Sequence, residues 1–242
     1  MWRAILVVLV VADVADADTP SYRVYATKAA NVETTTVEWD DGEATFDKTS
    51  AHVVSTFVRS DKTRAHDRAY YASRPDGVYL VGRLGDSESE TLTESGSIAE
   101  PAQLVLPIPF AAGNYPLKSR SKLVSSGNYL GHVDVQGELE VGGAQTVTVP
   151  AGSIDCVIVK TTATMHLVFV DPTLAKMKTY TKTTSTACYS PTIGLVRDEV
   201  ETVTSTASDA KKKPNVTRST VTTELTAFKG APAWLVATAG VK

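Results

Sequence analysis

The stretches VTVPAGSIDCVIV, residues 147–159, and CYSPTIGLVR, residues 188–197, are the most strongly patterned parts of this chain. The first turns at Pro-Ala-Gly and continues into a run of β-branched residues. The second places a Pro-to-Gly turn between two strand-like segments. Because proline presets φ and glycine accepts positive φ, both stretches predict turns between β-strands. Neither contains a set of catalytic residues, so the pattern indicates architecture before chemistry.

Two small sets of residues in these stretches carry the prediction. The corners are expected at Pro150, Ala151, Gly152, Pro191 and Gly194. The side chains expected to face the core or an apolar ligand are Ile154, Ile158, Tyr189 and Leu195. Because the strand after the first corner is apolar on both faces, one face packs on the core and the other needs a cover. That cover is either the protein's own loops or an apolar ligand, and the sequence leaves both open.

Strand signals recur along the rest of the chain, and helical periodicity is nearly absent. Residues 131–141 alternate, with Val133, Val135 and Leu139 on one face and polar side chains on the other. Runs of this kind are bounded by Gly, Pro, Asn and Asp, which is typical of antiparallel sheets. We therefore predict an all-β chain with little helix, in which residues 18–242 form one domain. The expected architecture is a single, strongly curved antiparallel sheet, an open half-barrel.

The N-terminus has the pattern of a secretory signal peptide. Arg3 precedes an apolar run from Ala4 to Ala12, which is too short to span a bilayer, and Ala15-Asp16-Ala17 fits a cleavage site. Residues 1–17 are predicted to be removed, and the protein to be exported to the periplasm or beyond the cell. The alternative is a buried first strand of a cytosolic protein. No later apolar run is long enough for a transmembrane helix.

Composition excludes some partners. The 242 residues are 43% hydrophobic and 21% charged, which is ordinary for a globular protein. The net charge of −3 gives no electrostatic footprint for nucleic acid or for an anionic membrane surface.

The two cysteines, Cys156 and Cys188, permit one disulfide in an exported protein. The alternative is a pair of free, buried thiols. If residues 153–189 form a three-strand meander, the cysteines lie on its first and third strands. Those strands are about 10 Å apart, which is beyond disulfide reach.

The chemical motifs are weak. No His pair has metal-ligand spacing, no glycine loop would cradle phosphate, and no nucleophile elbow is present, so we expect no catalytic residues, no metal and no cofactor. Gly85-Asp86-Ser87 is similar to the start of one esterase motif, but it sits in an acidic stretch. A secreted hydrolase that uses Ser87 or His166 is the least favoured hypothesis.

Several motifs together resemble an uncharacterised family of exported bacterial β proteins, a domain of unknown function. They are the two opening stretches, Leu106-Pro107-Ile108-Pro109 with Gly113, and Asp76-Gly77-Val78-Tyr79, and they span about residues 75–200. The chain departs from the family pattern at Ile154, where an aromatic residue is usual, and at Tyr189, where tryptophan is usual. The resemblance implies an open half-barrel, distantly similar to the LolA and LolB lipoprotein carriers, and it brings no catalytic residues.

The sequence therefore favours a non-enzymatic, exported protein that binds a lipid, another apolar ligand or a lipidated partner in a concave sheet. The alternative is a structural or protein-interaction module of the cell envelope, which would use exposed strands to pair with an envelope protein.

Overall fold

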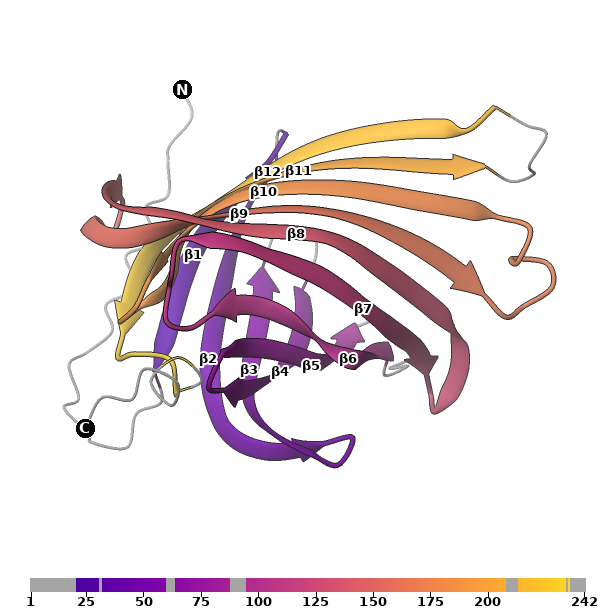
Figure 1. Cartoon of the computed structure of the whole chain (residues 1–242), viewed down its shortest axis with the longest axis horizontal. Coiled ribbons are helices and arrows are strands. Elements are labelled where there is room, and N and C mark those ends of the chain that lie inside the picture. The colour runs from indigo at the N-terminus through magenta and orange to yellow at the C-terminus, as the bar shows by residue number, and fades with distance from the viewer. Residues whose placement is uncertain are drawn as a thin grey trace, which may run out of the picture.

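The computed structural model describes residues 21–30, 32–59, 64–87, 95–207, 213–233 and 235. In this part of the chain twelve β-strands form one antiparallel sheet that closes into a barrel (Figure 1). The predicted signal peptide, residues 1–17, lies outside the described residues. The strands are β1 (Tyr22–Ala29), β2 (Val32–Phe46), β3 (Thr49–Arg59), β4 (Arg64–Arg74), β5 (Gly77–Ser87), β6 (Ser95–Pro107), β7 (Gly113–Ser125), β8 (Asn128–Val149), β9 (Gly152–Phe169), β10 (Lys178–Ser190), β11 (Gly194–Ala207) and β12 (Asn215–Lys229).

The prediction of an all-β, antiparallel chain with little helix is confirmed, whereas the open half-barrel is wrong. β1 pairs with β2 along one side and with β12 along the other, from Tyr22 opposite Lys229 to Ala29 opposite Val221. An open sheet would leave the backbone N–H and C=O groups of both edge strands unpaired, and closure pairs them. The pairing joins residues about 200 positions apart in the chain, so no local sequence pattern predicts it.

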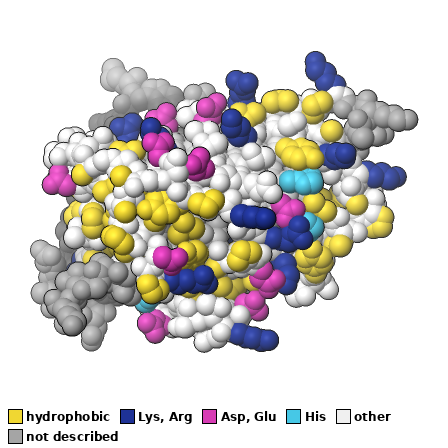
Figure 2. Space-filling model, viewed as in Figure 1, with side chains coloured by type: hydrophobic (Ala, Val, Ile, Leu, Met, Phe, Trp, Pro, Cys, Tyr) yellow, Lys and Arg dark blue, Asp and Glu magenta, His cyan; other side chains and the backbone are white. Residues whose placement is uncertain are grey.

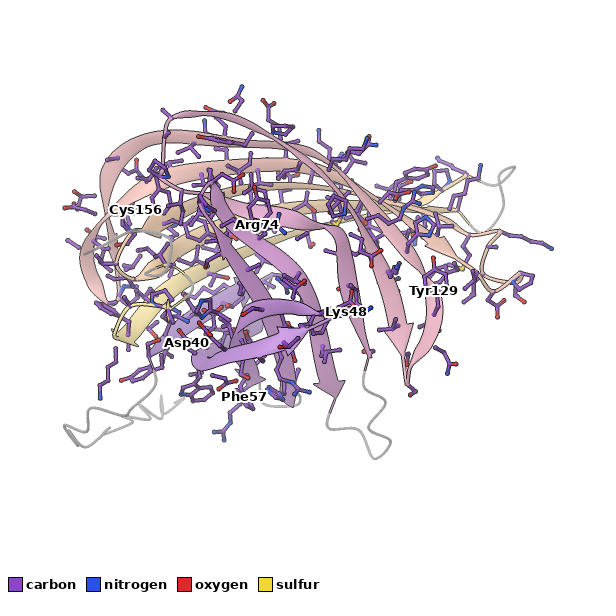
Figure 3. The ribbon with its side chains drawn as sticks, turned by 60° about the horizontal axis from the view of Figure 1, so that its bottom comes forward. Asp40, Lys48, Phe57, Arg74, Tyr129 and Cys156 are labelled. Atoms are coloured by element: carbon purple, nitrogen blue, oxygen red, sulfur yellow. A yellow bond between two sulfur atoms is a disulfide. The ribbon has the colours of Figure 1, made fainter. Side chains whose placement is uncertain are left out.

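Each strand pairs with its neighbours in the sequence, so the connections alternate between the two ends of the barrel. We call the end that carries the connections at 75–76, 108–112, 150–151 and 191–193 the signature rim. Two of these connections touch, because the Ile108 N–H donates to the Asp76 carbonyl at 3.2 Å. The motifs behind the family resemblance therefore lie on one rim. Figure 3 shows Cys156 toward this rim and Tyr129 toward the opposite one.

The wall is weakest between β6 and β7. These strands pair only from Ser95 opposite Ser125 to Ala99 opposite Ser121, and then separate toward the signature rim. Proline has no N–H for a ladder hydrogen bond, and both separating segments contain it, at Pro101 in β6 and at Pro116 in β7.

The main core fills the barrel near the signature rim. Eight strands already give a barrel just wide enough for wall side chains to fill, so a twelve-stranded barrel needs further filling. The C-terminal segment supplies it, since Leu235 is 1% exposed among barrel residues. The buried Asp40 carboxylate holds this segment by accepting a hydrogen bond from the Ala233 N–H at 2.6 Å. The buried members of this core are Val54, Val78, Leu106, Ile108, Leu117, Leu139, Val141, Val159 and Leu235.

A second core forms where the β8–β9 turn reaches β12, and there the Ala151 N–H donates to the Leu225 carbonyl at 3.2 Å. It contains Cys156 and Cys188, which form a disulfide with Cα atoms 5.5 Å apart. That distance is ordinary for a disulfide. The three-strand meander considered for residues 153–189 does not form: β9 runs unbroken from Gly152 to Phe169 and pairs directly with β10, so the cysteines lie on adjacent strands.

Reducing the Cys156–Cys188 disulfide is expected to lower the free energy of unfolding by about 3–4 kcal/mol, because the bond closes a 32-residue loop in the unfolded chain. Urea unfolding with and without a reductant measures this. The double variant Cys156→Ala, Cys188→Ala is the control, because its midpoint should not respond to the reductant. An equal midpoint for the oxidised and reduced wild type would contradict the expectation.

Leu235→Ala is expected to lower the free energy of unfolding by about 2–4 kcal/mol, because it leaves a cavity in the main core. Leu174→Ala, at a leucine that is 40% exposed, is the matched control and should cost less than about 1 kcal/mol. Denaturant unfolding of both variants decides this. Equal costs would mean that the C-terminal segment does not help to fill the barrel.

Candidate functional site

The outer surface of the barrel is largely polar where the strands alternate. On β8, Val135 and Leu139 are buried, whereas Gln136, Glu138 and Glu140 are exposed. Figure 2 shows basic, acidic and hydrophobic side chains interspersed over one face. This distribution directs attention to the interior.

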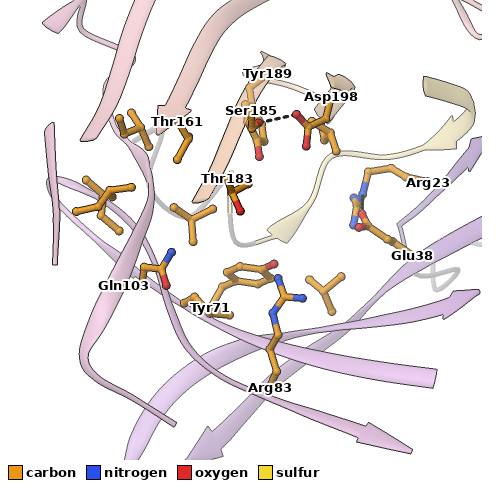
Figure 4. Close-up of a pocket in the computed structure, with 17 residues that line it drawn as sticks. Arg23, Glu38, Tyr71, Arg83, Gln103, Thr161, Thr183, Ser185, Tyr189 and Asp198 are labelled. Carbon is orange, nitrogen blue, oxygen red and sulfur yellow. Dashed lines mark hydrogen bonds and ion pairs between the residues drawn. The ribbon is translucent and has the colours of Figure 1, made fainter. Parts of the chain in front are cut away.

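A cavity of about 450 Å³ lies inside the barrel, next to the main core (Figure 4). Its volume falls in the range of small-molecule sites. Its lining has an apolar and a polar part. The apolar part consists of Val54, Leu80, Leu104, Val105, Leu117, Leu139 and Leu195, and the polar part of Arg23, Glu38, Tyr71, Arg83, Gln103, Thr161, Thr183, Ser185, Tyr189 and Asp198.

Strand alternation explains how these residues reach the cavity. Side chains of a strand point alternately to the two faces of the sheet, so Thr183, Ser185 and Ala187 of β10 share a face. On β11, Asp198 is opposite Ala187 and therefore points to the same side. The Ser185 hydroxyl donates to Asp198 Oδ1 at 2.6 Å. The small hydroxyl side chains of Thr183 and Ser185 leave the cavity open, whereas leucines at these positions would fill it.

The cavity adjoins the separation between β6 and β7. The lining includes Gln103, Leu104 and Val105, from the part of β6 that does not pair with β7, and Leu117, from the facing part of β7. A side-chain hydrogen bond bridges the separation, because the Ser119 hydroxyl donates to Gln103 Oε1 at 3.4 Å. One wall of the cavity is therefore held by side chains instead of a backbone ladder.

An ion pair lies at another part of the lining. Arg23 is 1% exposed, and its Nε donates to Glu38 Oε2 at 3.1 Å. The Tyr25 hydroxyl donates to the same carboxylate oxygen at 3.2 Å and lies 3.3 Å from the Leu195 carbonyl. The ion pair joins β1 to β2, and the Tyr25 hydroxyl links both to β11.

Burial sets the charge state of several groups here. It raises the pKa of Tyr71 and Tyr189 above the ordinary range, so both hydroxyls stay neutral hydrogen-bonding groups at physiological pH. Burial also raises the pKa of the Asp198 carboxyl, against the lowering effect of its hydrogen bonds from Ser185 and the Glu199 backbone. Asp198 is therefore more easily protonated than an exposed aspartate.

Asp198→Asn is expected to stabilise the protein more at pH 7 than at pH 3. With its pKa raised on folding, the native state binds the extra proton between the unfolded pKa, about 4, and the higher folded pKa. Stability therefore falls as pH rises through that window, and asparagine removes this loss while still accepting from Ser185. Urea unfolding of variant and wild type at both pH values gives the difference. A difference that does not change with pH would contradict the expectation.

The structure separates the residues singled out in the sequence. Tyr189 and Leu195 line the cavity, whereas Ile154 and Ile158 pack in the second core. The corner residues form connections of the signature rim: Pro150 and Ala151 make the β8–β9 turn, Gly152 opens β9 with φ +122°, Pro191 begins the β10–β11 turn, and Gly194 opens β11 with φ +91°. Their positive φ explains the two glycines, since L side chains rarely adopt it.

The residues considered for hydrolysis are far apart in the sheet. Ser87 ends β5, whereas His166 lies on β9 with its ring stacked on Tyr180 at 4.4 Å. The outer face does bring another serine near a histidine: the Ser55 hydroxyl lies 3.4 Å from His66 Nε2 and also hydrogen-bonds Asp41. Ser55 is only 4% exposed, however, so this hydroxyl is poorly placed to attack a substrate.

Sequence inspection missed most of the polar lining. Arg23, Glu38, Arg83 and Asp198 each stand in an ordinary alternating strand, and nothing local marks them. A weak signal exists in the alternate threonines at residues 179–183 and 202–206, which are small polar residues on inward positions. Within the described ranges, no three His, Cys, Asp or Glu side chains gather in a way that could hold a metal ion.

Comparison with known proteins identifies no family for this chain. No protein-family model matches the chain, and no curated protein matches it. Among solved structures, a crystal structure described as a "putative lipoprotein" from Parabacteroides distasonis is 15% identical, covers 87% of this chain and 95% of its own, and has a TM-score of 0.44. The resemblance to the LolA and LolB carriers stays a prediction.

The described residues include no helix that is long and apolar enough to cross a membrane.

Proposed function

We propose that this protein is a non-enzymatic binding protein that holds a small, partly apolar ligand inside its barrel. The observation that carries the proposal is the cavity, whose lining combines leucines and valines with hydroxyl and charged groups. Such a two-part lining fits an amphiphilic molecule better than a purely apolar one, because buried polar groups need hydrogen-bonding partners.

The separation between β6 and β7 supplies a route to the cavity. Opening it would break side-chain contacts such as Ser119 to Gln103, without breaking a backbone ladder. Ligand exchange through this wall would therefore not require the barrel to unfold. The acyl chain of a lipid or of a lipidated partner could enter in the same way.

Apolar burial alone would give weak binding. A ten-carbon chain would gain roughly 8 kcal/mol from burial of its CH₂ groups, against an association cost of about 4–15 kcal/mol. A ligand for this cavity therefore needs polar contacts as well, and the charged lining offers them.

Export is part of the proposal. The signal-like residues 1–17 support it, and so does the disulfide, because disulfides persist mainly in oxidising compartments.

A second candidate is an interaction module of the cell envelope. Large apolar side chains are exposed near the rim opposite the signature rim: Tyr129, Leu130, Val170, Leu174, Tyr180 and Val216. The segments of β6 and β7 that do not pair with each other also offer backbone groups to an added strand. This function does not depend on the cavity, so blocking the cavity separates the two.

Thr183→Trp is expected to weaken ligand binding at least tenfold, because Thr183 lines the cavity and an indole would fill it. Thr184→Trp is the matched control, because Thr184, the next residue on β10, is exposed and should tolerate the ring with unchanged binding. Titration of the delipidated protein with a dansyl-labelled fatty acid measures affinity, and mass spectrometry of an organic extract identifies copurified ligand. No binding by the wild type, together with an extract free of ligand, would overturn the proposal.

A further inference from the structure

The Arg23 guanidinium is a buried charge with unused donors. Only its Nε is hydrogen-bonded, to Glu38, and within the described part of the chain neither Nη1 nor Nη2 has a hydrogen-bond partner. Leaving a buried charged donor unsatisfied is costly in a folded protein. The unused pair of nitrogens therefore points to a partner that arrives from outside the chain.

The position of Arg23 shows where such a partner would bind. Arg23 belongs to the cavity lining, and Figure 4 shows it beside Glu38 at one side of the cavity. Glu38 accepts the hydrogen bond from Nε of the guanidinium, so Nη1 and Nη2 remain available to donate to a ligand. A guanidinium donates in a planar fork that matches the two oxygens of a carboxylate or a phosphate. It has no acceptor, so the partner must be a hydrogen-bond acceptor.

The other charges of the cavity fit an anionic head group of limited charge. Arg83 is a second cation in the lining, and it also lies 3.6 Å from Asp67. The acidic groups that line the cavity are Glu38 and Asp198, and the pKa of Asp198 is raised by burial. The phenols of Tyr71 and Tyr189 are neutral and can donate.

We propose that Arg23 is the anchor for the oxyanion head of an amphiphilic ligand, a carboxylate or a phosphate, while the ligand's apolar tail occupies the leucine-lined part of the cavity. This inference rests on the proposed function. Glu38 orients the guanidinium and, as a negative charge next to the head group, also limits the affinity. Ligand selection therefore depends on the balance between these two side chains.

The test compares four ligands with the same tail: decanoic acid, decyl phosphate, decanol and decylamine. Calorimetric titration of the delipidated wild-type protein is expected to show the two acids binding at least tenfold tighter than the alcohol, with the amine weakest. Whichever acid binds tighter identifies the head group as carboxylate or phosphate. Arg23→Gln should remove the preference for acids, whereas Arg197→Gln should keep it, because Arg197 is an exposed arginine paired with Glu224 at 3.7 Å.

Glu38→Gln provides a second variant in case Arg23→Gln does not fold. It keeps an acceptor for the Arg23 Nε and removes the competing charge. We expect its unliganded melting temperature to fall and its affinity for the tighter acid to rise about tenfold, a combination that a merely structural role would not produce.

The outcomes separate the two proposals. If the alcohol binds as tightly as the acids and Thr183→Trp abolishes its binding, the cavity binds ligand but the role of Arg23 is wrong. The role of Arg23 is also wrong if Glu38→Gln leaves acid affinity unchanged or lowers it. If none of the four ligands binds, the proposed function fails and this inference fails with it.

Discussion

The pairing of β1 with β12 is the constraint on which the rest of the structure depends. It joins the first and last strands of the sheet, so it converts a curved sheet with two free edges into a barrel with an interior. The closing strand also carries Arg23 and Tyr25, both almost fully buried. Without this pairing, Arg23 and Glu38 would lie at the edge of a sheet and in water. Closure therefore creates the cavity and brings its main charge into it.

The stretches that dominate the sequence correctly predict strands and corners, since turn chemistry is local. They do not reveal closure, which depends on strands far apart in the chain. Local signals can also mislead. Asp40-Asp41-Gly42 has the composition of a hairpin turn, yet Gly42 with φ +87° accommodates a bulge inside β2. The actual turn uses Asp47 and Lys48, both with positive φ and neither a glycine. The end of a strand is thus fixed by pairing with the next strand as much as by composition.

The cavity could not be predicted for a related reason. Its lining is drawn from eleven strands, β1 to β11, with one to three residues from each. Most of these contributions look like the normal inward position of an alternating strand, so an arginine such as Arg23 is indistinguishable in sequence from an outward one. Only the register between strands shows that Ser185 meets Asp198, or that Arg23 is opposite Glu38. The turn motifs of the signature rim, by contrast, can be recognised in the sequence, because each turn is contained in a single connection.

The Arg23–Glu38 pair is difficult to explain as a device for stability. Removing a buried ion pair from water costs several kcal/mol per ion, and two apolar residues of similar size often do as well or better. Here the pair is also incompletely bonded, because two guanidinium nitrogens lack partners among the described residues. The disulfide and the docked C-terminal segment, both near the signature rim, help to offset such a cost. A bound acceptor would offset it directly: at a hundred times its Kd, a ligand stabilises the native state by about 2.7 kcal/mol. The unliganded barrel would then be the less stable form, and the charge inside it would serve recognition more than folding.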